Sequence, residues 1–104
     1  MLGAIIGDIV GSRFEWNNNR SKDFDFLTYK CFLTDDSIMS LAVAQAILVS
    51  KPDYSDLSKN AVECMQSVGR NYPNCGYTGG FYRWMFSDNP QPYNSYGNGA
   101  AMRV

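Results

Sequence analysis

The sequence predicts a small all-α domain, because helical signals recur in three segments of its 104 residues. Residues 57–68 carry apolar side chains at the amphipathic spacing i, i+4, i+7, i+8 and i+11. Residues 35–50 are apolar nearly all round, which is typical of a central, buried helix. Residues 2–12 form a short apolar segment with a glycine at every fourth position. A chain of this length suits one domain with a modest core, so we expect a single domain over residues 1–104.

The predicted first helix, residues 2–12, places Gly3, Gly7 and Gly11 on one face. Each glycine costs a helix about 1 kcal/mol relative to alanine, so three on one face predict close packing of another backbone there. A glycine-rich strand and turn is the competing interpretation, and we favour it less. Asp8 lies inside this apolar segment, where a carboxylate needs a hydrogen-bonding partner.

The other predicted elements are marked by capping and breaking residues. Residues 13–33 predict a loop, because their three consecutive asparagines do not readily nucleate a helix. Ser55 is expected to cap the third helix, and Gly69 is expected to end it. The exposed face of that helix is polar, so we interpret it as a scaffold element.

The second half of the chain is rich in aromatic residues and turns. Residues 76–80 contain three glycines and predict a flexible turn before the aromatic run at residues 81–86. Such a run is more typical of a core or an interface than of a base-stacking platform, since Arg83 is its only basic residue. Gly97-Asn98-Gly99 predicts a turn that opens a final short helix at Ala100.

Composition excludes several classes of function. A net charge of −1 and a pI near 5.1 provide no electrostatic basis for binding nucleic acid or an anionic membrane. The three cysteines form no CxxC pair, and their odd number fits a reducing, cytoplasmic location. The apolar start lacks a basic region and reaches Asp8 early, so we expect neither a signal peptide nor a membrane span. The absence of histidine excludes a Cys–His nucleophilic pair.

The motif Thr34-Asp35-Asp36-Ser37 is the strongest candidate for a functional site. It places two carboxylates and two hydroxyls directly before the apolar run of the second helix. Hard oxygen donors of this kind suit Mg²⁺ or Ca²⁺. The same residues also suit a simple helix start, because threonine is a good N-cap and acids in the first turn offset the helix dipole. Spacing alone leaves both interpretations open.

The segment Gly97-Asn98-Gly99 is a second candidate. Backbone N–H groups at a glycine turn before a helix can hold a phosphate group. Alone this motif is weak, because Asn-Gly is also an ordinary turn signal.

Taken in order, the early Gly-Asp segment with Glu15, the motif Thr34–Ser37 and the segment Gly97–Arg103 resemble the N-terminal part of the ADP-ribosylglycohydrolase family. The resemblance extends over essentially the whole chain. It implies an all-α, orthogonal helical bundle with a cleft that binds ADP-ribose and a pair of Mg²⁺ ions. It also implies hydrolysis of ADP-ribosyl bonds on modified proteins or on small ADP-ribosyl compounds.

The resemblance assigns roles to individual residues. It implies that Thr34, Asp35 and Asp36 are metal ligands, and that the two aspartates with Glu15 form the catalytic acids. Glu15 would contact the ribose near the scissile bond. The turn Gly97, Asn98 and Gly99 would lie near the diphosphate and ribose. With the resemblance included, the metal interpretation of Thr34–Asp36 is favoured, and it remains compatible with an N-cap at Thr34.

This sequence departs from the family pattern in two respects. Ser37 stands where threonine is common, which is a mild change. The family also carries a second acidic motif of Asp-x-Asp-Thr type nearer its C-terminus, and this sequence contains none. We therefore expect a truncated domain with about half an active site and with uncovered apolar surface.

Two classes of function follow from these expectations. The first is a Mg²⁺-dependent ADP-ribosylglycohydrolase acting on ADP-ribose linkages, whose isolated short chain could lack activity. The second is a catalytically inactive fold used as a binding, inhibitor or interaction module. In either case, self-association or a partner chain is expected to cover the apolar surface.

Overall fold

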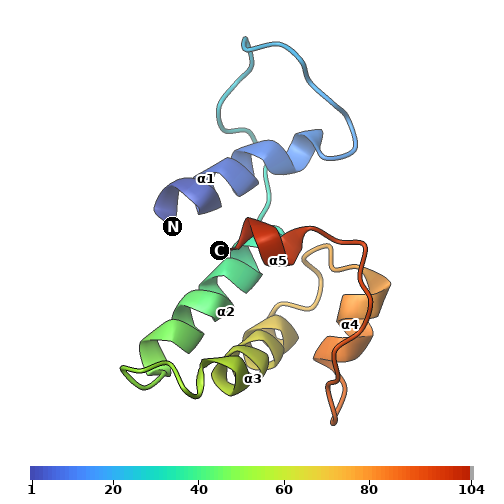
Figure 1. Cartoon of the computed structure of the whole chain (residues 1–104). Coiled ribbons are helices and arrows are strands. Elements are labelled where there is room, and N and C mark those ends of the chain that lie inside the picture. The colour runs from blue at the N-terminus through green and yellow to red at the C-terminus, as the bar shows by residue number, and fades with distance from the viewer. Residues whose placement is uncertain (104) are drawn as a thin grey trace.

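The computed structural model describes residues 1–103 as helices joined by loops (Figure 1). Its elements are α1 (Leu2–Gly11), the 3₁₀ helix η1 (Ser12–Phe14), α2 (Asp35–Val49), α3 (Leu57–Asn71), α4 (Gly79–Met85) and α5 (Gly99–Met102). No strand occurs within residues 1–103. The predicted all-α class is therefore confirmed.

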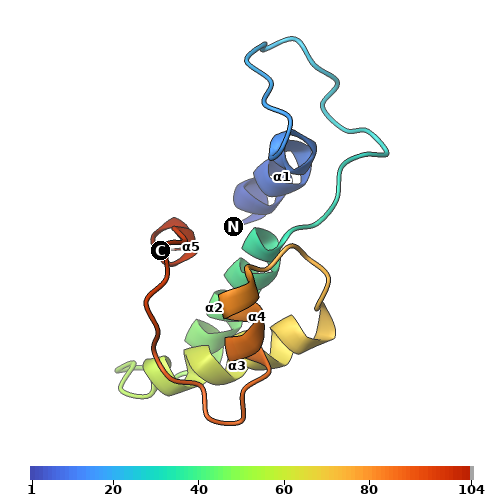
Figure 2. The same ribbon diagram turned by 90° about the vertical axis from the view of Figure 1, so that its right-hand side faces the viewer.

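Helix α2 is the central element of the fold. Helix α3 packs along its body and α4 lies on the far side of α3, while α1 lies across the N-terminal end of α2 (Figure 1, Figure 2). The turn at α5 lies close to that same end, where Arg103 contacts Asp36. Thr34 is the N-cap of α2 and accepts a hydrogen bond from the Asp36 N–H at 3.2 Å. Asp35 and Asp36 occupy the first turn, where their charges favour the positive end of the helix dipole. The structure thus confirms that Thr34 caps this helix and that the two aspartates lie in its first turn.

The core forms where α2, α3 and α4 meet. Ile38, Met39 and Met85 are its largest fully buried apolar side chains. Gly69 lies inside α3 and is buried against them, because an added Cβ would collide with the Met85 sulfur and lie 3.1 Å from the Met39 methyl. The prediction that Gly69 ends this helix is wrong, because the residue serves close packing and the helix continues to Asn71.

Side chains of α3 also hold α4 in place. The amide of Gln66 donates to the carbonyl oxygens of Trp84 at 3.1 Å and of Ser87 at 2.9 Å. The Nε of Arg70 donates to the carbonyl of Met85 at 2.8 Å. These bonds satisfy carbonyl groups at the end of α4 that have no partner inside the helix.

The segment between α1 and α2 is a long loop, as the sequence predicts, except that η1 forms its first turn. Arg13 organises this loop. Its guanidinium donates to the Thr28 hydroxyl at 2.8 Å and lies over the rings of Phe14 and Phe24, at 4.6 and 5.7 Å. The two rings contact each other edge to face, with centroids 5.3 Å apart. These contacts order a segment that is otherwise mostly exposed.

Two other local predictions are wrong. Ser55 is not the cap of α3; Asp56 occupies the N-cap position, and its side chain instead accepts from the N–H of Lys51. The close backbone packing predicted for the glycine face of α1 is also not observed. Apart from neighbouring residues and the backbone of α1 itself, no described atom lies within 4 Å of a Cβ built on Gly3, Gly7 or Gly11.

Helix α2 is only partly buried, contrary to the prediction from its apolar composition. Ile38, Met39 and Ala42 are buried, whereas Leu48 is 84% exposed near the other end of the helix. The radius of gyration, 15.1 Å, exceeds the value of about 13 Å expected for a compact domain of this size. The chain therefore leaves substantial apolar surface uncovered. Among residues 1–103, no helix is both long enough and apolar enough to cross a membrane.

Candidate functional site

A cavity of about 460 Å³ brings the sequence-predicted motifs together. Glu15 enters it from the turn after η1, and Asp35 and Asp36 enter it from the first turn of α2. The turn Gly97, Asn98 and Gly99 forms part of its wall at the start of α5. Residues far apart in the sequence thus line one space.

A positively charged side chain, Arg103, lies beside the acidic residues of the cavity. The Arg103 guanidinium lies 3.3 Å from Oδ1 of Asp36 and 3.8 Å from Oδ2 of Asp35. Burial raises the pKa of the Asp35 carboxyl, and the neighbouring Asp36 charge raises it further, while Arg103 opposes both effects. Two adjacent carboxylates in a partly buried place favour a positive counter-charge, and the guanidinium supplies it here.

Thr34 lies behind this wall and is 5% exposed. Its hydroxyl donates to Oδ1 of Asp8 at 2.5 Å, and its backbone N–H donates to Oδ2 of Asp8 at 3.1 Å. The hydroxyl of Ser37 donates to the same Oδ2 at 2.5 Å. Asp8 therefore has the partners that its place in an apolar segment requires, and it joins α1 to the start of α2.

The glycine turn is shaped by its contact with Arg103. A Cβ on Gly99 would lie 2.9 Å from Cζ and 3.0 Å from Nη2 of Arg103, so a side chain would displace the guanidinium. The N–H of Gly97 donates to the Ser95 hydroxyl at 3.1 Å. Arg103 consequently connects the turn to the carboxylates of α2. The expected role of this turn near a diphosphate stays a prediction.

One side of the cavity is aromatic. The rings of Tyr77, Phe81 and Trp84 stack in series, with centroids 5.7 and 5.3 Å apart, and the last two line the cavity. The sequence predicted a core or an interface for this run and did not place it beside the acids. Phe81 and Trp84 are three residues apart in α4, and this i, i+3 spacing is the signal that would have placed them on one face. The role of Arg103 was also missed, although it ends the Gly97–Arg103 motif.

The donor set fits a hard divalent cation in chemistry but is incomplete. Asp35 and Asp36 already bind a cationic group, and the Thr34 hydroxyl accepts the N–H of Asp36 beside them. Carboxylate and hydroxyl oxygens are donors that Mg²⁺ prefers. Among residues 1–103, however, no three acidic, thiol or imidazole side chains converge closely enough to hold a metal ion. Further ligands are needed for a closed site.

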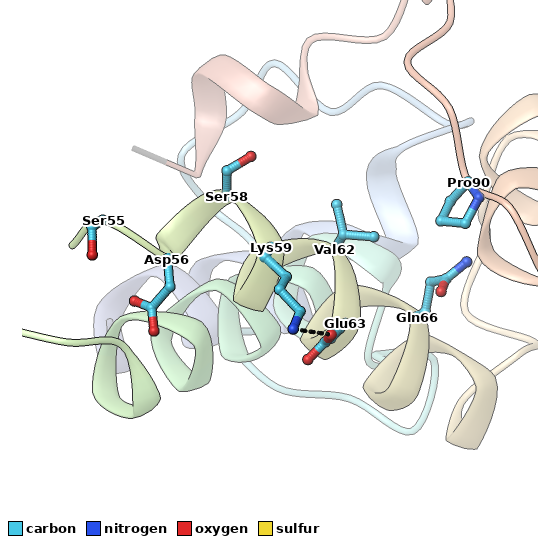
Figure 3. Close-up of a pocket in the computed structure, with 8 residues that line it drawn as sticks. All are labelled: Ser55, Asp56, Ser58, Lys59, Val62, Glu63, Gln66 and Pro90. Carbon is cyan, nitrogen blue, oxygen red and sulfur yellow. Dashed lines mark ion pairs between the residues drawn. The ribbon is translucent and has the colours of Figure 1, made fainter.

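A second groove runs along the outer face of α3 (Figure 3), with a volume of about 590 Å³. Lys59 and Glu63 form an exposed ion pair there at 3.7 Å. Such a pair contributes about 0.3–0.5 kcal/mol to a helix. The groove is open, and its two acids, Asp56 and Glu63, belong to none of the motifs that the sequence singles out. We therefore place the candidate site in the cavity lined by Glu15, Asp35 and Asp36.

Comparison with known proteins identifies the family. The profile of the ADP-ribosylglycohydrolase family matches residues 1–104. The chain belongs to the ADP-ribosylglycohydrolase family. It is also 29% identical over 133 aligned positions to a Xenopus tropicalis protein named ADP-ribosylhydrolase ARH3. No solved structure matches it significantly.

This ADP-ribosylglycohydrolase-family chain is short relative to that protein. The alignment covers 100% of the chain but 36% of the Xenopus protein, so the chain spans about a third of the relative's length. The family assignment made from the ordered motifs is confirmed. The specific roles of Glu15, Asp35, Asp36 and the glycine turn stay predictions, supported by their shared cavity. The metal-ligand role of Thr34 also stays a prediction, and Thr34 does not line that cavity.

Proposed function

We propose that this chain supplies the acidic wall and glycine turn of an ADP-ribosylglycohydrolase site that hydrolyses ADP-ribosyl bonds with Mg²⁺. The observation that carries the proposal is the cavity itself. Glu15, the Asp35–Asp36 pair and the turn 97–99 all line it, although they come from separate parts of the sequence. The substrate class is an ADP-ribosylated protein or a small ADP-ribosyl compound, in line with the family.

Thr34, Asp35 and Asp36 would hold the metal ion. When bound, Mg²⁺ supplies polarisation of the ribose hydroxyls and activation of a water molecule. The residues fit this task because the two carboxylates already lie within 4 Å of a guanidinium cation. Other acidic groups must complete the coordination, since the described residues provide no closed cluster.

The carboxylates of Glu15, Asp35 and Asp36 would also act directly on the substrate, apart from holding a metal ion. Cleavage of a glycosidic bond passes through an oxocarbenium-like state, in which positive charge develops on the ribose. Glu15 and the Asp35–Asp36 pair place negative charge along the cavity wall, where it stabilises that charge and orients the attacking water. Glu15 is exposed and carries no hydrogen bond from another described side chain, so it is accessible to a bound ribose.

Turnover by the purified chain tests this proposal. ADP-ribosylated protein is incubated with the chain and Mg²⁺, and released ADP-ribose is measured with and without EDTA. EDTA-sensitive release that is lost in Asp35→Ala and kept in the matched variant Asp53→Ala supports the proposal. Asp53 serves as the control because it is an exposed acid outside the cavity. Release that EDTA leaves unchanged contradicts the metal dependence.

The exposed apolar surface favours a second candidate, an inactive binding or interaction module that self-associates. Trp16 is 91% exposed and Leu48 is 84% exposed, and neither lines the cavity. Patches of such residues mark association sites. Absence of turnover, together with a concentration-dependent sedimentation coefficient that Leu48→Glu abolishes, would support this candidate over the hydrolase.

A further inference from the structure

Asp8 contacts Thr34 through two hydrogen bonds, although one would be enough to join α1 to α2. Both of its carboxylate oxygens accept from one residue, since Oδ1 takes the Thr34 hydroxyl and Oδ2 takes the Thr34 backbone N–H. The residue lies on α1, 26 positions before Thr34. A two-point contact fixes the orientation of the threonine side chain as well as its position.

The contact with Asp8 fixes the direction of the Thr34 hydroxyl proton. A hydroxyl has one proton to donate and two lone pairs that accept. The proton is given to Asp8, and one lone pair accepts the Asp36 N–H. One lone pair remains. Without an acceptor at Asp8 the proton would be free to rotate, and it could occupy the direction that a cation needs.

We propose that Asp8 is a positioning residue, which holds the Thr34 hydroxyl proton away from the metal side and so keeps one oxygen lone pair available to a divalent cation. The inference rests on the proposed function, because it concerns the same cation. It predicts that Asp8 acts through Thr34 and not by contact with the ion. Neither Asp8 nor Thr34 lines the cavity, so the double-mutant cycle below, and not the position of Asp8, separates the two roles.

The first test measures affinity for Mn²⁺, a hard cation that reports its free form directly by electron paramagnetic resonance. Asp8→Asn replaces one acceptor oxygen by an amide donor at similar volume. We expect its Kd for Mn²⁺ to rise about 10- to 100-fold, the usual effect of removing a partner that orients a metal ligand. The matched control is Asp53→Asn, the same substitution at an exposed acid outside the cavity. Its Kd for Mn²⁺ should stay at the wild-type value.

A double-mutant cycle separates positioning from a general structural role. Thr34→Val removes the hydroxyl at nearly constant shape, so it should also weaken Mn²⁺ binding. If Asp8 acts through this hydroxyl, then adding Asp8→Asn to Thr34→Val should weaken binding little further. An equal loss from Asp8→Asn in both backgrounds would overturn the inference, because Asp8 would then act by another route.

A metal-free measurement keeps the inference testable if the wild-type chain does not take up Mn²⁺ or if a variant does not fold. In the wild-type protein, NMR couplings should show Thr34 in a single χ1 rotamer, and amide exchange should show a protected Asp36 N–H. Averaged rotamers at Thr34 would overturn the positioning role. Failure of Mn²⁺ uptake with a fixed Thr34 would instead count against the proposed function, so the two failures are distinguishable.

Discussion

The guanidinium of Arg103 contacts the carboxylate of Asp36 at 3.3 Å across 67 positions of sequence. Asp36 lies in the first turn of α2, whereas Arg103 directly follows the four-residue helix α5. A helix that short has no independent stability in water, so its order depends on contacts of this kind. The ion pair between Arg103 and Asp36 is one contact that fixes the last turn of the described chain.

Arg103→Gln should release α5 while leaving the rest of the fold intact. Amide exchange in residues 99–102 should approach the unprotected rate, because the ion pair that docks the turn is lost. The free energy of unfolding should fall by less than about 1 kcal/mol, since Asp36 is half exposed and solvent screens the pair. Arg20→Gln, in the exposed loop, is the matched control and should change neither quantity. Unchanged exchange in α5 would show that other contacts hold it.

Two glycines in helices should respond to alanine in opposite directions. Gly69→Ala forces a methyl group against Met85 and Met39, and such overpacking costs about 1–3 kcal/mol of unfolding free energy. Gly7→Ala adds a methyl where, apart from neighbouring residues and the α1 backbone, no described atom lies within 4 Å, and it should stabilise the helix by up to about 1 kcal/mol. Urea denaturation measures both changes. A destabilising Gly7→Ala would indicate that another surface covers that face in solution.

Gln66→Glu should loosen α4 from α3. The wild-type amide donates to two carbonyl oxygens, and a carboxylate at this place would turn both contacts into repulsions. Losing a partly buried donor costs about 1 kcal/mol for each hydrogen bond. Glu63→Gln, one turn earlier on the exposed face of α3, is the control and should change stability by less than about 0.5 kcal/mol. Thermal unfolding followed by circular dichroism checks the difference.

Cys31 and Cys75 should differ in reactivity as pH rises. The backbone hydrogen bond from Thr28 lowers the pKa of the Cys31 thiol, so its thiolate forms at lower pH. Burial raises the pKa of the Cys75 thiol, and the charges of Asp35 and Asp8 raise it further. Because the thiolate is the nucleophile, iodoacetamide at pH 8 should modify Cys31 faster.

Peptide mass spectrometry over time measures the two alkylation rates. The difference should narrow at higher pH, once both thiols ionise. Equal rates at pH 8 would contradict the environments described for these two side chains.

Sequence periodicity was sufficient for the helices because it depends on neighbours along the chain. The amphipathic spacing from Leu57 to Val68 predicts α3, and Thr34 with two acids predicts the start of α2. Gly69 was misassigned, since its role comes from Met85 on another helix. A glycine near the end of a helical pattern has the same local signature whether it caps the helix or admits a neighbour.

The candidate site was predictable only in part, because sequence motifs do not show which distant segments come into contact. Glu15, Asp35, Asp36 and the turn 97–99 were named from their motifs, and the structure places them around one cavity. The sequence did not reveal that Arg103 would lie on the two aspartates or that Phe81 and Trp84 would form the facing wall. Those relationships are set by how α4 and the last turn fold back toward α2.

The attachment of α1 has a consequence for how the chain opens. Val10 is the one apolar side chain of α1 that is buried among the described residues, whereas Asp8 makes three polar contacts with the start of α2. Because α1 buries little apolar surface, this helix should detach before α2 and α3 separate, although its three hydrogen bonds to the Asp8 carboxylate oppose the opening. Detachment of α1 would break the hydrogen bonds of Asp8 and expose the Thr34 and Ser37 hydroxyls to solvent.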